Sequence, residues 1–158
     1  YRAATSRNAS FLALLSASDV AVLSLVPGLG GEPLLPSSGI AAVLDSLIAA
    51  AEGKPIVLQA VGTSSSEAVG SSPEKQKLFF DTLFSTLWTR RVSFALINVH
   101  QLSDLSPAPC DASTTRQGEP LGGSFASFAC SLGLFDESGE SKPAWVSVLG
   151  GAATFASP

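Results

Sequence analysis

The 158-residue chain is 46% hydrophobic and 14% charged, which is enough apolar material for the core of one globular domain. Nine Lys and Arg against thirteen Asp and Glu give a formal net charge of −4, and no basic run is present, so nucleic acid is a poor candidate partner. No apolar run approaches the roughly 20 residues that span a bilayer, and no signal-peptide pattern opens the chain.

The first predicted elements alternate between helix and strand. Residues 8–16 are typical of the end of a helix, and residues 20–26 form a continuous apolar run that predicts a buried strand. A loop rich in glycine and proline, residues 27–33, follows this strand, and Ser37 or Ser38 then caps a second helix. The apolar residues of that helix recur at helical spacing: Ile40, Val43, Leu44, Leu47 and Ile48.

The run from Lys54 to Thr63 organises the rest of the chain. It is apolar, too short for a buried helix and closed by a glycine, which predicts a parallel strand buried on both faces. After a serine-rich loop, Ser72 as N-cap and Pro73 at the first helical position predict a helix to about residue 90. In α/β folds, chemistry lies on the loops that leave the carboxyl ends of strands, so we expect function at residues 59–67.

A third strand is predicted at residues 92–99, followed by a long polar loop that extends to Pro120. Two weaker helices, around residues 124–132 and 143–149, complete the chain. Strands that alternate with helices predict an α/β fold of parallel β/α units with right-handed crossovers. Three such strands are about half of what a closed eight-stranded barrel needs.

Three kinds of site are disfavoured by the residues. The glycine cluster at 28–31 has no lysine beside it and no helix directly after it, unlike a phosphate-binding loop. His100, the only histidine, has no Gly-x-Ser-x-Gly nucleophile motif to serve. One histidine and two spaced cysteines do not make a metal-ligand set, so we expect no metal and no cofactor.

Paired carboxylates remain as a candidate chemistry, because glycosidases use two Asp or Glu groups about 5 to 10 Å apart. The carboxylates that follow predicted strands are Glu67 and Asp104. Glu67 lies in a serine-rich loop, where a solvated side chain is the favoured interpretation. Asp104 is better placed, although an aspartate that caps a loop fits its position equally well.

The chain contains no methionine and begins at Tyr1, from which we expect that it is not a complete primary translation product. Asn8 opens an Asn-Ala-Ser sequence, which is an N-glycosylation acceptor. Cys110 and Cys130 are the only cysteines, and buried thiols or a disulfide are equally open for them. A disulfide and a glycan would together indicate a secreted, cell-surface or organelle-lumen protein.

Four segments carry a family resemblance: residues 54–72, 104–111 and 128–134, and the Lys-Pro-Ala-Trp turn at 142–145. They resemble the C-terminal half of cellulase-like glycoside hydrolases with a (β/α)8 (TIM) barrel. The resemblance implies that the three strands are barrel strands six to eight. It also implies a layout in which residues 1–18 end a preceding helix, 19–149 form a partial barrel domain and 150–158 form a tail.

In this family, strand seven ends in a Gln-Glu-Val-Gly-Tyr run whose glutamate is the catalytic nucleophile. The resemblance matches this run to residues 59–63, which puts Ala60 at the nucleophile position and Thr63 at the tyrosine. Val99 falls where a tryptophan usually floors the sugar subsite, and the strand that carries the acid/base glutamate is not in the chain. Without a carboxylate at Ala60 the covalent step of a retaining mechanism is lost, so the catalytic site is predicted to be degenerate.

The resemblance implies five substrate-binding positions and a bridge between Cys110 and Cys130 that staples the loop after strand eight. We expect a non-catalytic barrel segment that acts as a structural or binding subunit and whose open sheet edges are covered by a protein partner or the missing N-terminal half-barrel. One alternative is a longer glycoside hydrolase acting on β-linked glucan, and another is a module that still binds oligosaccharides. The five implied positions are Gln59, Thr63, Asn98, Val99 and Asp104.

Overall fold

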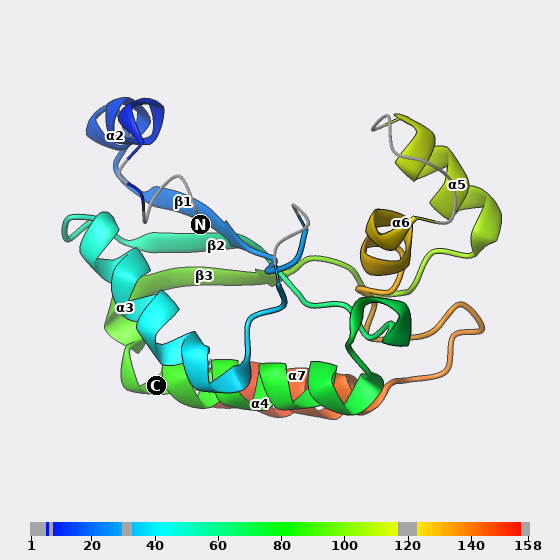
Figure 1. The fold of residues 1–158 in the computed structure, drawn as a ribbon. Helices are drawn as coiled ribbons and strands as arrows, with labels where there is room; N and C mark the ends of the chain where they lie inside the picture. The colour runs from blue at the N-terminus through cyan, green and yellow to red at the C-terminus, as the bar shows by residue number, and fades with distance from the viewer. Residues whose placement is uncertain (1–5, 7, 30–32, 117–122, 156–158) are drawn as a thin grey trace.

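The computed structural model describes residues 6, 8–29, 33–116 and 123–155, which form one α/β unit. Its sheet has three parallel strands in the order β1-β2-β3, as the sequence predicts (Figure 1). The strands are β1 (Ala21–Leu25), β2 (Ile56–Val61) and β3 (Phe94–Val99). Because all three strands run the same way, their carboxyl ends meet at one edge of the sheet.

Six helices and three short 3-10 turns connect and cover the strands within these described residues. The helices are α2 (Ala9–Ser16), α3 (Ile40–Ala50), α4 (Pro73–Thr89), α5 (Pro107–Arg116), α6 (Ser124–Ala129) and α7 (Pro143–Phe155). The turns are η1 (Ser37–Gly39), η2 (Glu67–Val69) and η3 (Arg91–Ser93). Helices α3, α4 and α7 lie on one side of the sheet, whereas α5 and α6 lie beyond the arrowheads of the strands (Figure 1).

The main hydrophobic core lies between the sheet and the helices α3, α4 and α7. Its largest fully buried side chains include Ile40, Leu44, Leu58, Phe80 and Leu83. We call this side of the sheet the covered face. Burial of these side chains supplies most of the stability that the fold gains from the hydrophobic effect.

The other side of the sheet, which we call the open face, carries side chains that remain accessible. Val22, Val57 and Leu96 pair with one another across the three strands, and Val22 and Leu96 are 48% and 51% exposed. Nearer the carboxyl ends, the open face carries Gln59 and Asn98, which are both exposed. A parallel sheet is normally buried on both faces, so this face has the character of a surface that another unit covers.

Several elements differ from the predicted ones. Strand β3 begins at Phe94, because Val92 belongs to η3 and is 93% exposed. Helix α5 occupies part of the predicted polar loop, where its weak apolar periodicity concealed it. Helix α6 ends at Ala129, three residues before the predicted end.

Helix α7 continues to Phe155, beyond the predicted end at residue 149, so most of the predicted tail is helical. The helix runs through Gly150 and Gly151, although glycine weakens a helix by about 1 kcal/mol per residue relative to alanine. Packing explains Gly151, since a Cβ there would lie 2.1 Å from the Phe84 ring of α4. Residues 156–158 of the predicted tail lie outside the described residues.

Candidate functional site at the carboxyl ends of the strands

A row of polar side chains crosses the open face near the carboxyl ends of the strands. Gln59 Nε2 donates a hydrogen bond of 3.2 Å to Ser24 Oγ on β1. Asn98 Nδ2, on β3, donates one of 2.9 Å to the backbone oxygen of Gln59. The structure therefore brings together two of the predicted substrate-binding residues, Gln59 and Asn98. This row supplies amide and hydroxyl groups that suit a neutral polar ligand.

Strand β2 has a β-bulge at Gln59, between Leu58 and Ala60. Leu58 pairs with Leu23, but the next pair joins Ala60 to Ser24, so Gln59 is an extra residue in β2. A bulge re-aims the side chains that follow it. Ala60, the strand partner of Ser24, is half-buried and packs against a small second hydrophobic cluster.

This second cluster lies at the strand ends and consists of Val26, Phe128 and Leu132, all buried. Phe128 comes from α6 and packs closely on the loop after β1. A Cβ at Gly28 would lie 2.6 Å from the Phe128 ring, and Gly28 has a φ of 97°, so both space and backbone conformation favour glycine there. The position that the resemblance assigns to the nucleophile therefore lies half-buried against an apolar cluster.

Asp104 is held in an ion pair rather than presented to a ligand. Its Oδ2 lies 2.5 Å from Lys142 Nζ, and the two side chains are only 16% and 9% exposed. Its Oδ1 accepts a hydrogen bond of 2.8 Å from the backbone N–H of Gly133. Burial raises the pKa of the Asp104 carboxyl, although the Lys142 ammonium and the Gly133 N–H oppose this shift.

Lys142 links this ion pair to the loop after β2, because its Nζ also donates a hydrogen bond of 2.8 Å to Ser65 Oγ. The same loop is joined to the segment after α6 through Ser64 Oγ and Ser131 Oγ, 2.7 Å apart. The Ser65 N–H donates a further bond of 3.0 Å to the Ser131 carbonyl. These contacts fix the two loops that follow β2 and β3 against each other.

Gln76 is a buried contributor to this network that the sequence analysis missed. Its Nε2 lies 2.9 Å from the carbonyl of Thr63, 3.1 Å from that of Gly133 and 3.3 Å from that of Leu132. The available signal was a glutamine on the inner, apolar side of the predicted helix, three residues before Phe79. A polar residue at such a position is stable only with hydrogen-bond partners.

The remaining predicted residues have more ordinary surroundings. Thr63 is buried, Val99 is half-buried against the main core and Glu67 is exposed in η2. Asn8 caps α2, since its Oδ1 accepts a 2.9 Å hydrogen bond from Ser10 N. Asn8 is exposed, and the capping bond uses Oδ1, not Nδ2, the atom to which an N-linked glycan would be attached.

A disulfide joins Cys110 of α5 to Cys130, immediately after α6, as the resemblance implies. In the part of the chain that the structure describes, no three His, Cys, Asp or Glu side chains lie together as metal ligands would. Nor does any helix there combine the length and apolar character needed to cross a membrane.

No protein-family model and no curated protein matches the sequence. Solved structures with a similar fold were found. A GH5_18 protein from Bifidobacterium longum has a TM-score of 0.62 and 22% identity, over 89% of this chain and 31% of that chain. The fold resembles part of a glycoside hydrolase domain. A GH2 β-galacturonidase from Eisenbergiella tayi gives a TM-score of 0.61 and 17% identity, over 89% of this chain and 24% of that one.

An active-site mutant of a β-1,3-glucanosyltransferase from Rhizomucor miehei, in complex with laminaritriose, gives a TM-score of 0.51 and 16% identity over 83% of this chain. Even there the chain covers only 44% of its neighbour, so it spans less than half the length of each of these proteins. The predicted α/β fold and its likeness to glycoside hydrolase domains are confirmed. The degenerate catalytic site stays a prediction.

Proposed function

We propose that this chain is a non-catalytic, glycoside hydrolase-like barrel segment that serves as a structural or binding subunit. The observation that carries the proposal is the packing of Ala60 against Val26, Phe128 and Leu132. An alanine has no group that can attack a sugar or hold a charge. Its apolar surroundings would also raise the pKa of any carboxyl introduced there, which opposes the ionised form that a nucleophile needs.

The two surviving carboxylates are poor substitutes for a nucleophile. Both oxygens of Asp104 already have partners, Lys142 and the Gly133 N–H. Glu67 is exposed in η2, outside the polar row on the open face. A retaining glycosidase needs two carboxyl groups facing each other across the scissile bond, and neither residue is held for that purpose.

Activity assays on the native polypeptide that carries this chain test the proposal. We expect no product from a panel of aryl β-glycosides and β-linked glucan oligosaccharides, and the Ala60→Glu variant should be equally inactive. Cleavage that is lost in Asp104→Asn or Glu67→Gln would overturn the proposal and support the alternative, a longer glycoside hydrolase. An intact mass near 16.1 kDa or near twice that value would show whether the native polypeptide is long enough for this alternative.

The open face supports the partner that this proposal requires. Its apolar row of Val22, Val57 and Leu96 would be covered by further β/α units, supplied by an N-terminal half-barrel or by a protein partner. We expect the isolated chain to bind an apolar dye or to self-associate. A stable monomer that binds no dye would contradict this part of the proposal.

The polar row of Ser24, Gln59 and Asn98 favours a second candidate function, oligosaccharide binding without cleavage. Saturable heat on titration with laminari- or cello-oligosaccharides, lost in a Gln59→Ala/Asn98→Ala variant, would support it. A purely architectural subunit would give no saturable heat. We place either form in a secreted, cell-surface or luminal compartment, because the disulfide and the accessible Asn8 suit an oxidising, glycosylating environment.

A further inference from the structure

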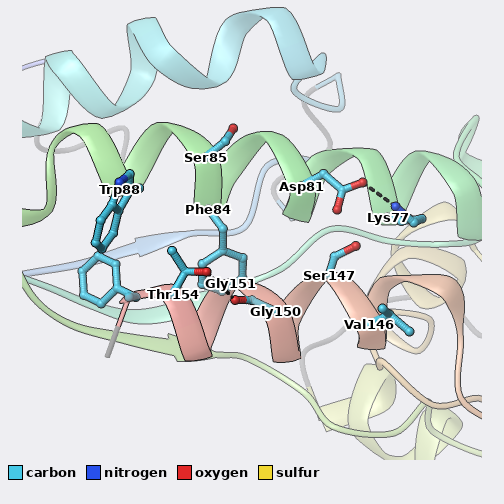
Figure 2. A pocket seen from close by; sticks show the side chains of 11 residues that line it. Lys77, Asp81, Phe84, Ser85, Trp88, Val146, Ser147, Gly150, Gly151 and Thr154 are labelled. Atoms are coloured by element: carbon cyan, nitrogen blue, oxygen red, sulfur yellow. Dashed lines mark hydrogen bonds and ion pairs between the residues drawn. The ribbon is translucent and has the colours of Figure 1, made fainter. Parts of the chain in front are cut away.

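Figure 2 shows a groove between α4 and α7 on the helical layer. Its lining shares no residue with the polar row at the strand ends. Its volume is about 460 Å³, within the range of small-molecule sites. Phe84 and Trp88 from α4 and Phe155 from α7 form its aromatic end. Arg91 lies over the Trp88 ring, 4.4 Å from its centroid, and holds that ring from one side.

Two neighbouring glycines of α7 form the floor of the groove and have different roles. Gly151 allows the Phe84 ring to approach the backbone, since its Cβ would lie 2.1 Å from that ring. A Cβ at Gly150 would meet no atom within 4 Å. No neighbour therefore requires glycine at position 150, and the space above it is open.

The polar end of the groove is electrically balanced. Lys77 Nζ lies 2.6 Å from Asp81 Oδ2, and both side chains are more than two-fifths exposed. Burial acts to raise the pKa of Asp81, but the Lys77 ammonium and the Ser147 hydroxyl together outweigh it, so the pKa is lowered. The pair places donor hydrogens of the ammonium beside the acceptor oxygens of the carboxylate, an arrangement that matches two adjacent hydroxyl groups.

The hydroxyl groups along the groove offer acceptors. Ser85 Oγ donates its hydrogen to the carbonyl of Thr82, 3.0 Å away, and Thr154 Oγ1 donates to that of Gly150, 2.9 Å away. Each oxygen keeps lone pairs for a ligand that brings its own donors. A ligand for this groove therefore needs an apolar surface for the aromatic end and neutral groups that both donate and accept at the other.

We propose that the groove between α4 and α7 binds a single neutral polyhydroxylated ring, such as a hexopyranose. The apolar C–H face of the ring would pack on Phe84, Trp88 and Phe155, and two neighbouring hydroxyls would bind the Lys77–Asp81 pair. The balanced pair gives an ionic ligand no net attraction. This site goes beyond the proposed function, since it involves neither the polar row nor the open face.

Tryptophan fluorescence tests the proposal, because Trp145→Phe leaves Trp88 as the only tryptophan. In this background, methyl β-D-glucopyranoside should cause a saturable change in emission. Gly150→Leu, which fills the groove, should weaken the apparent affinity at least about tenfold, a loss of about 1.4 kcal/mol. Ala152→Leu, on an exposed position of the same helix outside the groove, is the matched control and should leave the affinity unchanged.

Two further variants separate the parts of the proposal. Asp81→Asn should weaken binding severalfold, and Gln59→Ala/Asn98→Ala should leave it unchanged. No saturable change up to about 100 mM glucoside, far above a weak millimolar site, would overturn the proposal. So would equal binding by Gly150→Leu, or binding of cyclohexanol in place of the glucoside. Loss of binding in the Gln59→Ala/Asn98→Ala variant would place the sugar on the open face instead.

Discussion

The two faces of the sheet differ more than their sequences suggest. Leu58 and Leu96 are leucines on paired strands, yet Leu58 is fully buried against the helices and Leu96 is 51% exposed on the open face. The difference comes from the layers, because α3, α4 and α7 all lie on one side (Figure 1). Residue type alone therefore does not determine burial in this chain, and the open face is where the proposed second unit would pack.

The largest expected effect comes from a matched pair of truncations. Leu58→Ala leaves a cavity in the covered core and should lower the free energy of unfolding by about 3 to 5 kcal/mol. Leu96→Ala removes an exposed side chain and should cost less than about 1 kcal/mol. Urea denaturation of the isolated chain measures both. Equal losses of unfolding free energy in the two variants would mean that the open face is already buried, for example by self-association. The proposed difference between the two faces would then be wrong.

The ion pair between Lys142 and Asp104 should contribute to stability as the buried side chains of the covered face do, although it lies beside the candidate site. Lys142→Met keeps the aliphatic packing but leaves the Asp104 carboxylate buried without its cation, which should cost about 3 kcal/mol at neutral pH. A cost near zero in urea denaturation would show that the pair is solvated. In that case the contacts of Lys142 with Asp104 and Ser65 would not hold the loops after β2 and β3 together.

The pH dependence of this variant has a definite sign. Burial already raises the pKa of Asp104, and removal of the Lys142 ammonium raises it further. The folded state then binds the Asp104 proton more tightly than the unfolded state, so stability is retained at low pH and lost as the pH rises through the raised pKa. Unfolding free energies of Lys142→Met should therefore fall from pH 4 to 7. The Asp104→Asn/Lys142→Met variant should lose this slope.

The disulfide joins α5 to the segment after α6 at the strand ends. Its removal tests whether these helices are stabilised independently of the covered core. Replacing Cys110 and Cys130 by serine frees a loop of 20 residues and should cost up to about 3 kcal/mol in the chain-entropy model. Hydrogen exchange should rise first in α5, while the amides of β2 keep their protection. Uniform loss of protection would show that the bridge supports the whole fold.

Much of the fold was predictable because its signals are local. The apolar runs of the strands, Ser72 and Pro73 at the start of α4, and the alternation that implies a parallel sheet depend only on neighbouring residues. The pairing of Cys110 with Cys130 came from the family resemblance instead. These features together were enough to predict where the carboxyl ends of the strands, and with them the candidate site, would lie.

The features that escaped prediction depend on distant residues. The partners of Gln76 include the carbonyls of Leu132 and Gly133, more than 50 residues away. The bulge at Gln59 exists only through the pairing of β2 with β1. Glycine occupies position 151 within α7 because the Phe84 ring packs where a Cβ would lie. Tertiary packing overrides local propensity in each case, and no local pattern records it.

The smallest expected effect compares the caps of two helices, one on the covered face and one at the edge of the fold. Ser72 Oγ accepts a 3.2 Å hydrogen bond from Lys75 N at the start of α4, so Ser72→Ala should cost about 1 kcal/mol of global stability. Asn8 caps α2, a helix of eight residues in which Leu14 is 72% exposed. Because such an edge helix opens locally, Asn8→Ala should speed hydrogen exchange in α2 and leave the urea midpoint unchanged. A shift of that midpoint as large as the one for Ser72→Ala would show that α2 unfolds together with the covered core.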